Sequence, residues 1–519
     1  MRRSEMLARL GQHRGLWDIV VIGGGATGVG IAVDAASRGY DVLLLEQHDF
    51  GKGTSSRSTK LVHGGVRYLE QGNIALVMEA LKERGLLRQN APHLVSNLAF
   101  VVPNYDWWEA PFYGLGLKVY NALAGKYGFG SSEILTREET LARLPTIKTD
   151  GLRGGVVYYD GQFDDARLLI NLVATAAEQG ATLVNYARVV GITKGSDGFI
   201  EGVVAVDQEG GQQWTIAARV VINATGAFSD SVRRLAEPDV QSLIAPSQGI
   251  HLVFHESFLS ADAAIMVPHT ADGRVMFAIP WHRHTLVGTT DTPIETPTLE
   301  PQPMPSEIDF ILETAGRYLH KAPTRDDVLS VFVGIRPLVK SGDGRLTAAL
   351  SRDHTIHIDA SGLLTTTGGK WTTYRNMAEH TVDQAADLAR LTERPCVTRT
   401  LNVHGFHTNA DRFGTLKVYG SDAVGIHELM RETPSLSAPL HGDLPYTGAE
   451  VIWATRHEMA RTVEDILARR TRALFLNARA ADAMAPEVAR LMSGELGWDA
   501  ARQAAEVAAF TALARRYQI

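Results

Sequence analysis

The sequence predicts an α/β fold built on a parallel sheet, joined to an antiparallel sheet and followed by a helical C-terminal domain. Two observations predict it. Three segments far apart in the chain, 19–46, 219–229 and 362–385, each combine a strand with a glycine-bearing turn, the arrangement found where a parallel sheet carries its ligand site. Residues 246–355 instead contain short strands separated by turn signals, and from about residue 413 the pattern is helical. A chain of 519 residues is long enough for two or three domains.

The first segment, IVVIGGGATGVGIAVDAASRG (19–39), carries a G-x-G-x-x-G motif. A β-branched apolar run precedes Gly23, and small apolar residues follow Gly25 and Gly28. This spacing allows a tight turn, a close approach of the backbone to a pyrophosphate and close packing of a helix on a strand. The next apolar strand ends in Glu46, 18 residues beyond Gly28, close to where an acidic residue accepts a ribose hydroxyl. The segment predicts a dinucleotide site, and because the three strand-and-turn segments are discontinuous, FAD is favoured over NAD.

Composition and charge narrow the range of partners. There are 51 Lys and Arg residues against 58 Asp and Glu, a net charge of -7, so a nucleic-acid partner is disfavoured. The single cysteine, Cys396, excludes an internal disulfide and a multi-cysteine metal site. No metal is expected, because HRH (282–284) and HTIH (354–357) lack nearby cysteine and acid ligands and are better explained as surface histidines.

The N-terminal segment MRRSEMLARLGQHRG has no apolar core of the secretory type and predicts a short amphipathic helix. No uncharged apolar run reaches the roughly 18 residues that span a bilayer. Any contact with a membrane is therefore expected to be peripheral.

Longer motifs carry a resemblance to a known family. Six motifs follow one another along the chain: TSSRSTKLVHGGVRYLEQGN (54–73), FDDARLL, VINATGAFSD, AIPWHRHTLVGTTDTP, GIRPL (334–338) and GGKWTTYRNMAEH (368–380). With them the chain resembles the FAD-dependent, quinone-linked glycerol-3-phosphate dehydrogenases over essentially its whole length from Trp17. The resemblance implies oxidation of sn-glycerol 3-phosphate to dihydroxyacetone phosphate by hydride transfer to FAD, with electrons passed on to quinone.

The resemblance also implies an architecture: a glutathione-reductase-type FAD-binding domain of the Rossmann-like kind, an interleaved antiparallel substrate-binding domain and a C-terminal helical domain. The expected boundaries are 17–95, 150–245 and 355–390 for the FAD-binding domain, 96–149 and 246–354 for the substrate-binding domain, and 395–519 for the helical domain. Within that last domain, Ile452, Met459, Val463 and Ile466 are expected to form one apolar helix face.

A phosphorylated substrate calls for arginine, whose planar group offers paired donors. Arg336 of GIRPL and Arg67 of GGVRY match the family's substrate arginines. Tyr68 is expected either to add a hydroxyl group or to be a buried structural tyrosine. Lys370 serves the flavin or the substrate. The catalytic residues expected are Arg336, Lys370, His251 and Arg67. For each arginine the structural alternative is an ordinary ion pair.

The remaining predicted residues are expected to hold FAD. His63 is placed on the flavin and His251 nearer the substrate, where an imidazole suits a general base; a structural histidine is the alternative for both. The turn TGGKWTT (367–373) begins a helix, whose N-terminus favours negative charge, and the resemblance puts it beside the N1 and O2 edge of the flavin. The cofactor residues expected are Gly23, Gly25, Gly28, Glu46, Ser55, Ser56, Lys60, His63, Thr225, Gly226, Gly368, Gly369, Lys370 and Thr372.

The stretch 104–125 is unusually aromatic, and two interpretations stay open. Amphipathic aromatic residues suit a membrane interface, where quinone is found, but Glu109 and Lys118 interrupt the stretch and favour a buried core segment. Its apolar members are Trp107, Trp108, Phe112, Tyr113, Leu115, Leu117 and Tyr120.

Alternatives to the leading function also stay open. A dehydrogenase of another polyol phosphate such as erythritol phosphate, or an oxygen-using glycerol-3-phosphate oxidase, shares nearly every motif. An amine or amino-acid oxidase and a non-catalytic flavin-binding scaffold explain the motifs less well. The expected location is the cytoplasmic side of the inner or plasma membrane, and the sequence leaves open whether the chain forms a homodimer.

Overall fold

The first sheet holds the predicted parallel strands. The computed structural model describes residues 1–65, 73–106, 109–268, 270, 273–340 and 354–519. Strands β10, β1, β2 and β7 pair in parallel, β18 extends the parallel part beside β10, and β17 closes that edge antiparallel to β18. The strands are β1 (Trp17–Ile22), β2 (Val42–Leu45), β7 (Thr182–Val184), β8 (Ala187–Lys194), β9 (Ile200–Asp207), β10 (Gln213–Asn223), β17 (His354–Ile358) and β18 (Leu364–Gly368).

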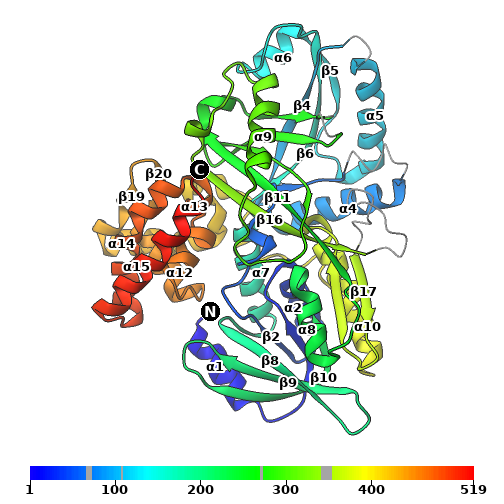
Figure 1. Ribbon diagram of the computed structural model, residues 1–519, viewed down its shortest axis with the longest axis vertical. Helices are drawn as coiled ribbons and strands as arrows, with labels where there is room; N and C mark the ends of the chain where they lie inside the picture. The colour runs from blue at the N-terminus through cyan, green and yellow to red at the C-terminus, as the bar shows by residue number, and fades with distance from the viewer. Residues whose placement is uncertain (66–72, 107–108, 269, 271–272, 341–353) are drawn as a thin grey trace.

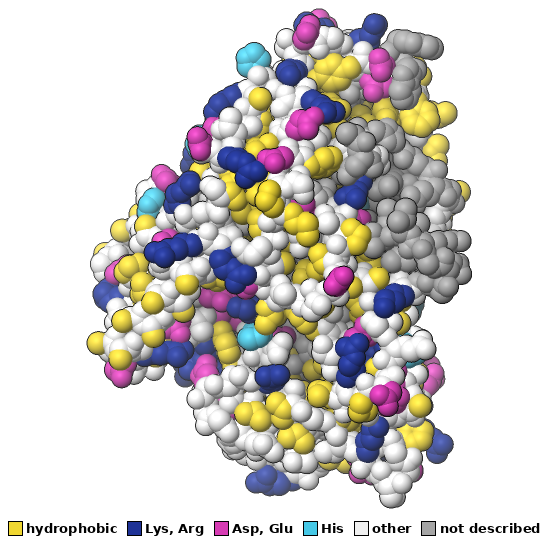
Figure 2. Space-filling view, in the orientation of Figure 1, with side chains coloured by type: hydrophobic (Ala, Val, Ile, Leu, Met, Phe, Trp, Pro, Cys, Tyr) yellow, Lys and Arg dark blue, Asp and Glu magenta, His cyan; other side chains and the backbone are white. Residues whose placement is uncertain are grey.

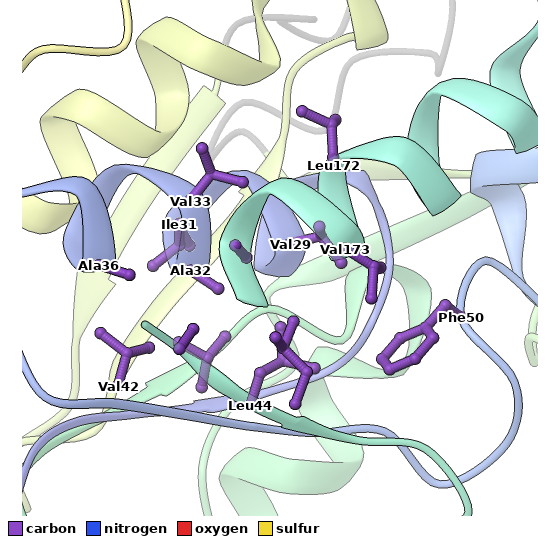
Figure 3. Close-up of a cluster of buried hydrophobic side chains, with 14 of the residues drawn as sticks. Val29, Ile31, Ala32, Val33, Ala36, Val42, Leu44, Phe50, Leu172 and Val173 are labelled. Atoms are coloured by element: carbon purple, nitrogen blue, oxygen red, sulfur yellow. The ribbon is translucent and has the colours of Figure 1, made fainter. Parts of the chain in front are cut away.

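The core of this sheet follows directly from the apolar strands. Ile19 pairs with Val42 on one side and Val220 on the other, and β2 is buried along its whole length, as a strand covered on both faces should be. Helix α2 (Ala26–Ser37) packs over these strands with α7 (Asp165–Glu178) on one side and α10 (Tyr374–Leu388) on the other. Figure 3 shows Ala32 and Ala36 of α2 and Val173 of α7 facing Val42 and Leu44 of β2.

The second sheet is mostly antiparallel, with one parallel pair between β4 and β12. It follows the order β15-β11-β14-β13-β12-β4-β6-β3, with β16 paired to β11 and β5 to β6. Its strands are β3 (Leu61–Val62), β4 (Val95–Asn104), β5 (Glu133–Thr136), β6 (Gly154–Phe163), β11 (Ile244–His255), β12 (Ala263–Val267), β13 (Met276–Trp281), β14 (His284–Gly288), β15 (Thr292–Pro293) and β16 (Ser330–Val339). Figure 1 places this sheet above the first one, with β11 and β16 crossing the middle of the molecule.

The position of β6 differs from the expected domain boundaries. The sequence assigned 150–245 to the FAD-binding domain, but β6 pairs with β4 all the way from Val95↔Phe163 to Asn104↔Gly154. Strand β3, within the segment 17–95, also pairs with β6. These two strands therefore belong to the second sheet. The pairing partner, which lies far away in the sequence, decides this, and the apolar pattern of β6 alone does not reveal it.

The remaining helices cover the sheets or form the C-terminal part of the molecule. As expected, the N-terminal segment begins with a short helix, α1. The helices are α1 (Arg3–Gln12), α4 (Ile74–Asn90), α5 (Glu109–Ala124), α6 (Arg137–Arg143), α8 (Ser229–Ala236), α9 (Pro305–Tyr318), α11 (Ala423–Glu432), α12 (Gly448–His457), α13 (Ala473–Leu476), α14 (Ala478–Leu496) and α15 (Ala500–Arg515). Within the described residues, no helix has the length and apolar character needed to cross a bilayer.

The C-terminal helical region, residues 395–519, stands beside both sheets in Figure 1. It includes one short hairpin, β19 (Pro439–His441) and β20 (Leu444–Thr447). His404 ties the region to α7, because its two ring nitrogens contact Glu178 at 2.6 Å and Asp422 at 2.8 Å.

The expected single helix face in this region is wrong. Helix α12 ends at His457, Met459 has a left-handed φ of 57°, and Asp465–Arg470 forms a separate π-helical turn. Ile452, Met459, Val463 and Ile466 are all buried, but they come from three consecutive pieces of chain. The apolar spacing correctly indicated that these residues are buried. They do not share one helix face, because the helix is interrupted at Met459.

Candidate functional site

A cavity of about 710 Å³ is bordered by both sheets, a size typical of sites for large ligands. The first sheet contributes the turns that follow β1, β2, β10 and β18, and the second contributes residues of β11, β13 and β16. The three strand-and-turn segments expected from the sequence therefore meet at the carboxyl ends of the parallel strands. This is the place where sheets of this type bind their ligands.

The G-x-G-x-x-G turn forms one wall of the cavity. Gly23 has a φ of 112°, and a Cβ there would lie 2.7 Å from the carbonyl oxygen of Ala224. Gly23 and Gly25 line the cavity, and a Cβ at Gly25 would lie 3.1 Å from Ser55 Oγ. Gly28 is not a lining residue; a Cβ there would overlap the carbonyl oxygen of Gly23. The first two glycines keep the backbone accessible to a ligand, whereas the third allows α2 to pack on β1.

Glu46 stands at the end of β2 and lines the cavity. Its carboxylate accepts hydrogen bonds from the backbone N–H of Gly24 at 2.6 Å and of His48 at 2.8 Å. Burial raises the pKa of Glu46, and these two hydrogen bonds oppose that rise. The carboxylate therefore ties the glycine turn to the next loop as well as facing the cavity.

The turns after β10 and β18 supply the other predicted cofactor residues. Thr225, Gly226, Gly368 and Gly369 all line the cavity. Thr225 Oγ1 donates to Asn223 Oδ1 at 2.7 Å, and the three glycines have positive φ values between 56° and 78°. The structure thus brings residues that are more than 140 positions apart in the sequence to one wall.

Lys370, Thr372 and His63 lie together at the cavity wall. The backbone N–H of His63 donates to Thr372 Oγ1 at 3.2 Å, which holds the TSSRSTKLVHGG segment against the turn that precedes α10. Lys370 directly precedes the 3-10 turn Trp371–Thr373. All three residues line the cavity, and their expected contact with the flavin stays a prediction.

Two predicted cofactor residues have other partners. Ser56 and Lys60 do not line the cavity, whereas Ser55 does. Ser56 Oγ donates to the carbonyl of Gly51 at 2.8 Å. The Lys60 ammonium is fully buried and donates to both oxygens of Asp165, at 2.9 and 2.7 Å. Lys60 Nζ also donates to the carbonyl oxygen of Ser56 at 2.7 Å, so its three donors all have protein partners and none is left for a phosphate. The expected contact of Ser56 and Lys60 with FAD stays a prediction.

Arg336 reaches the cavity from β16. Its Nη1 donates to Asp291 Oδ1 at 3.1 Å, and its Nη2 to the carbonyl oxygen of Thr290 at 3.0 Å. Asp291 also accepts a hydrogen bond from Ser247 Oγ. A guanidinium oriented in this way on a rigid strand is suited to an anionic ligand. Arg67 and Tyr68 lie outside the described residues.

His251 projects from β11 into the same site. Its Nε2 lies 2.9 Å from Thr59 Oγ1, and its ring stacks on Phe332 with 4.9 Å between centroids. Burial lowers the pKa of His251 well below its usual value, and the positive charges of Lys60 and Arg336 lower it further. The imidazole is therefore neutral at physiological pH.

Sequence reasoning missed Thr59, Asp291 and Phe332. Thr59 lies within the motif TSSRSTK, and Asp291 lies within TTDTP. The residues around neither position indicate which distant side chain it contacts. Thr59 contacts His251 across 192 positions of sequence, and Asp291 contacts Arg336 across 45.

The predicted surface position is wrong for His284 but holds for His357, whose side chain is 42% exposed. His284 is buried, and His282 Nε2 lies 2.9 Å from Asp164 Oδ2. His354 and His380 lie side by side, with 3.0 Å between ring nitrogens. Among the residues that the structure describes, no three histidine, cysteine, aspartate or glutamate side chains are grouped as a metal site would require.

The donor set fits FAD. A side chain at Gly23 or Gly25 would fill the space beside the glycine turn. Helix α2 begins directly after this turn, at Ala26, and the start of a helix attracts phosphate. In the described part of the chain, the buried Nδ1 of His251 has no hydrogen-bond partner, as is suitable for an atom that meets a ligand. A site of this kind between a parallel sheet and a second sheet defines an FAD-dependent oxidoreductase.

Comparisons with known proteins agree with this class. Residues 18–375 match the FAD dependent oxidoreductase family, and residues 367–503 match the C-terminal domain of alpha-glycerophosphate oxidase. The chain belongs to the family of FAD-dependent glycerol-3-phosphate dehydrogenases.

Individual relatives support the assignment over nearly the whole chain. A probable mitochondrial glycerol-3-phosphate dehydrogenase of Caenorhabditis elegans is 40% identical over 97% of this chain and 74% of its own length. The mitochondrial glycerol-3-phosphate dehydrogenase of Homo sapiens is 39% identical over 96% and 73%. The structure of the glycerol-3-phosphate dehydrogenase of Bacillus halodurans complexed with FAD covers 100% of this chain and 98% of its own, with a TM-score of 0.80 and 29% identity.

Proposed function

We propose that this protein oxidises sn-glycerol 3-phosphate to dihydroxyacetone phosphate and passes the electrons to a membrane quinone. The observation that carries the proposal is Arg336, held by Asp291 and Thr290 at the wall of a cavity that also contains His251 and fits FAD. The names of the relatives support the same substrate.

The residues divide between cofactor and substrate. The glycine turn, Glu46 and Ser55 hold the dinucleotide part of FAD, with Thr225 and Gly226 near its adenosine half. Gly368, Gly369 and Thr372 stand at its flavin end. When bound, FAD supplies the hydride acceptor.

Arg336 binds the substrate phosphate, because a planar guanidinium offers paired donors to phosphate oxygens. Lys370 adds a second positive charge to the same wall. The neutral imidazole of His251 accepts a hydrogen bond from the reacting hydroxyl group and takes its proton. Thr59 fixes the orientation of that imidazole through its contact with Nε2.

The test is anaerobic mixing of the flavoprotein with glycerol 3-phosphate while the flavin absorbance is followed. Rapid bleaching, followed by recovery when a soluble quinone is added, is the expected result. Glycerol 3-phosphate fails to bleach the flavin in the contrary case, although dithionite and erythritol phosphate both reduce it. That result would show that the substrate is another polyol phosphate. Rapid reoxidation by oxygen with stoichiometric peroxide, and none by quinone, would contradict the proposed acceptor.

We propose further that helix α5 docks this protein peripherally on the membrane. Helix α5 carries apolar side chains both toward the protein interior and at the surface. Tyr113, Leu117 and Tyr120 are buried against the second sheet, whereas Phe112 and Leu115 are 56% and 69% exposed. Trp107 and Trp108 lie outside the described residues. The aromatic stretch therefore contributes to the core with one set of side chains and also exposes apolar side chains at the surface, which supports both interpretations of the sequence at once.

Neighbouring exposed apolar side chains extend the surface formed by Phe112 and Leu115. Val119 lies one turn beyond Leu115, and Ile134 of β5 is close enough to contact a Cβ at Gly114. Figure 2 shows hydrophobic side chains at the edge of the molecule where Figure 1 places α5.

Cosedimentation with vesicles of mixed anionic and neutral lipid tests the docking. The double variant Phe112→Ser, Leu115→Ser is expected to lose most of the binding. Val424→Ser, which removes an apolar side chain of α11 that is 51% exposed, is expected to keep it. Equal binding by both variants would contradict a role of α5.

A further inference from the structure

The C-terminal helical region reaches the loop that follows β2. This loop, residues 46–57, lines the cavity with Glu46, Gln47 and the run 51–55. Asp49 belongs to the loop and is fully buried. A buried carboxylate in a loop requires strong partners, and here the partners come from the other end of the chain.

Two consecutive arginines hold Asp49. Arg469 Nε donates to Asp49 Oδ2 at 2.6 Å, and Arg470 donates to Oδ2 and Oδ1 at 2.7 and 2.9 Å. Both guanidiniums are buried. Burial alone raises the pKa of Asp49, but Arg470 and Arg469 outweigh burial and hold the pKa below its usual value. The carboxylate is therefore charged, and three charge-assisted hydrogen bonds fix the loop.

The same segment makes a second contact with the loop. Lys52, which lines the cavity, donates to both oxygens of Glu464 at 2.8 and 2.6 Å. Arg469 Nη1 also donates to Glu464 at 2.8 Å, so the two contacts belong to one network.

A third contact reaches the neighbouring stretch of the cavity wall, whose backbone is hydrogen-bonded to the loop from Tyr186 N to His48 O at 2.9 Å and from Ala187 N to Glu46 O at 2.8 Å. Tyr186 Oη donates to Asp465 at 2.7 Å, and Tyr186 directly precedes the run 187–190, which lines the cavity. The segment 464–470 thus holds two separate stretches of the cavity wall.

We propose that residues 464–470 are positioning residues for FAD, acting through Asp49, Lys52 and Tyr186 without contacting the cofactor. FAD retention then depends on the docking of the C-terminal helical region. Because coupling between two equilibria is reciprocal, bound FAD also stabilises that docking. The proposal concerns the cofactor and does not depend on which alcohol is oxidised.

The measurement is the rate of FAD release from the holoenzyme, followed as the rise in flavin fluorescence after dilution, in the absence of substrate. Glu464→Gln removes the negative charge that faces Lys52 and Arg469 but leaves Asp49 and both arginines in place, so the variant is expected to fold. It should release FAD about 5-fold faster or more, a change at the lower end of typical coupling effects. Asp49→Asn should release it faster still.

Two controls separate positioning from general stability. Val488→Ala truncates a fully buried residue of α14, so it should lower the Tm without changing FAD release. Arg456→Gln breaks an exposed ion pair with Glu495 inside the C-terminal helical region and should change neither. FAD release that follows the Tm in all four variants, or that is unchanged in Glu464→Gln, would overturn the proposal.

Discussion

Replacing Arg336 by alanine tests the substrate site most directly. The guanidinium makes hydrogen bonds to Asp291, Thr290 and Thr289, at 3.1, 3.0 and 3.4 Å, and its side chain is 24% exposed, toward the cavity that it lines. Hydrogen bonds to a charged partner contribute about 1.5–3 kcal/mol. At about 1.36 kcal/mol for each factor of ten, kcat/KM for glycerol 3-phosphate should fall by roughly 10- to 150-fold.

The same change also affects stability. The Asp291 side chain is 5% exposed, and in the alanine variant it loses the Arg336 guanidinium. Loss of one partner of a buried charge pair costs up to about 3–5 kcal/mol. The double variant Arg336→Ala, Asp291→Asn removes the buried charge as well, so it should recover much of the lost Tm without recovering activity.

Anaerobic stopped-flow bleaching of the flavin gives the rate and the apparent affinity, and the ratio of flavin to protein absorbance gives the FAD content. We expect a raised KM, a lowered kcat and an unchanged FAD content in both variants. A loss of FAD from the single variant, or a kcat/KM within twofold of the original, would refute the assignment of Arg336 to the substrate.

Three further predictions follow from the geometry. Gly28→Ala forces a Cβ into the backbone of the glycine turn and should lower both the Tm and FAD affinity, at a cost of about 1–3 kcal/mol, whereas Gly494→Ala, with open space around it, should not lower the Tm. Burial and two nearby cations keep His251 neutral. The pH profile of kcat/KM should therefore show no step near pH 6.5 that is due to His251. A step near pH 6.5 that is present in the original protein and absent from His251→Asn would contradict the neutral imidazole. Burial lowers the pKa of His404, but its two carboxylate neighbours outweigh burial and raise it to about 10. Its stabilisation is therefore fully present below about pH 6.5 and is lost as the pH rises through about 10, so thermal unfolding should distinguish His404→Gln from the original protein at pH 6 and not at pH 10.5.

The sequence by itself determined the parts that depend on neighbouring residues. A strand needs an apolar run, a tight turn needs glycine, and a helix start attracts phosphate. These are local requirements, so the glycine turn at Gly23 and Gly25 and the turn at Gly368 and Gly369 could be located from the residues alone. The discontinuity of the three strand-and-turn segments also led correctly to FAD.

Tertiary structure decided which side chains meet. Lys60 stands in a motif that indicates cofactor binding, yet its ammonium pairs with Asp165, 105 positions away. The pattern of β6 fits either sheet, and its pairing with β4 places it in the second. Helix α5 exposes one apolar face and buries the other, which no count of its aromatic residues could show.

The same holds for the C-terminal arginines. Asp49 meets Arg469 and Arg470 across 420 and 421 positions of sequence, and the local sequence of none of the three indicates the others. Local conformation is set by the residue and its neighbours along the chain, whereas the partner of a buried charge is set by how distant elements pack, because burial makes an unpaired charge costly wherever its partner comes from.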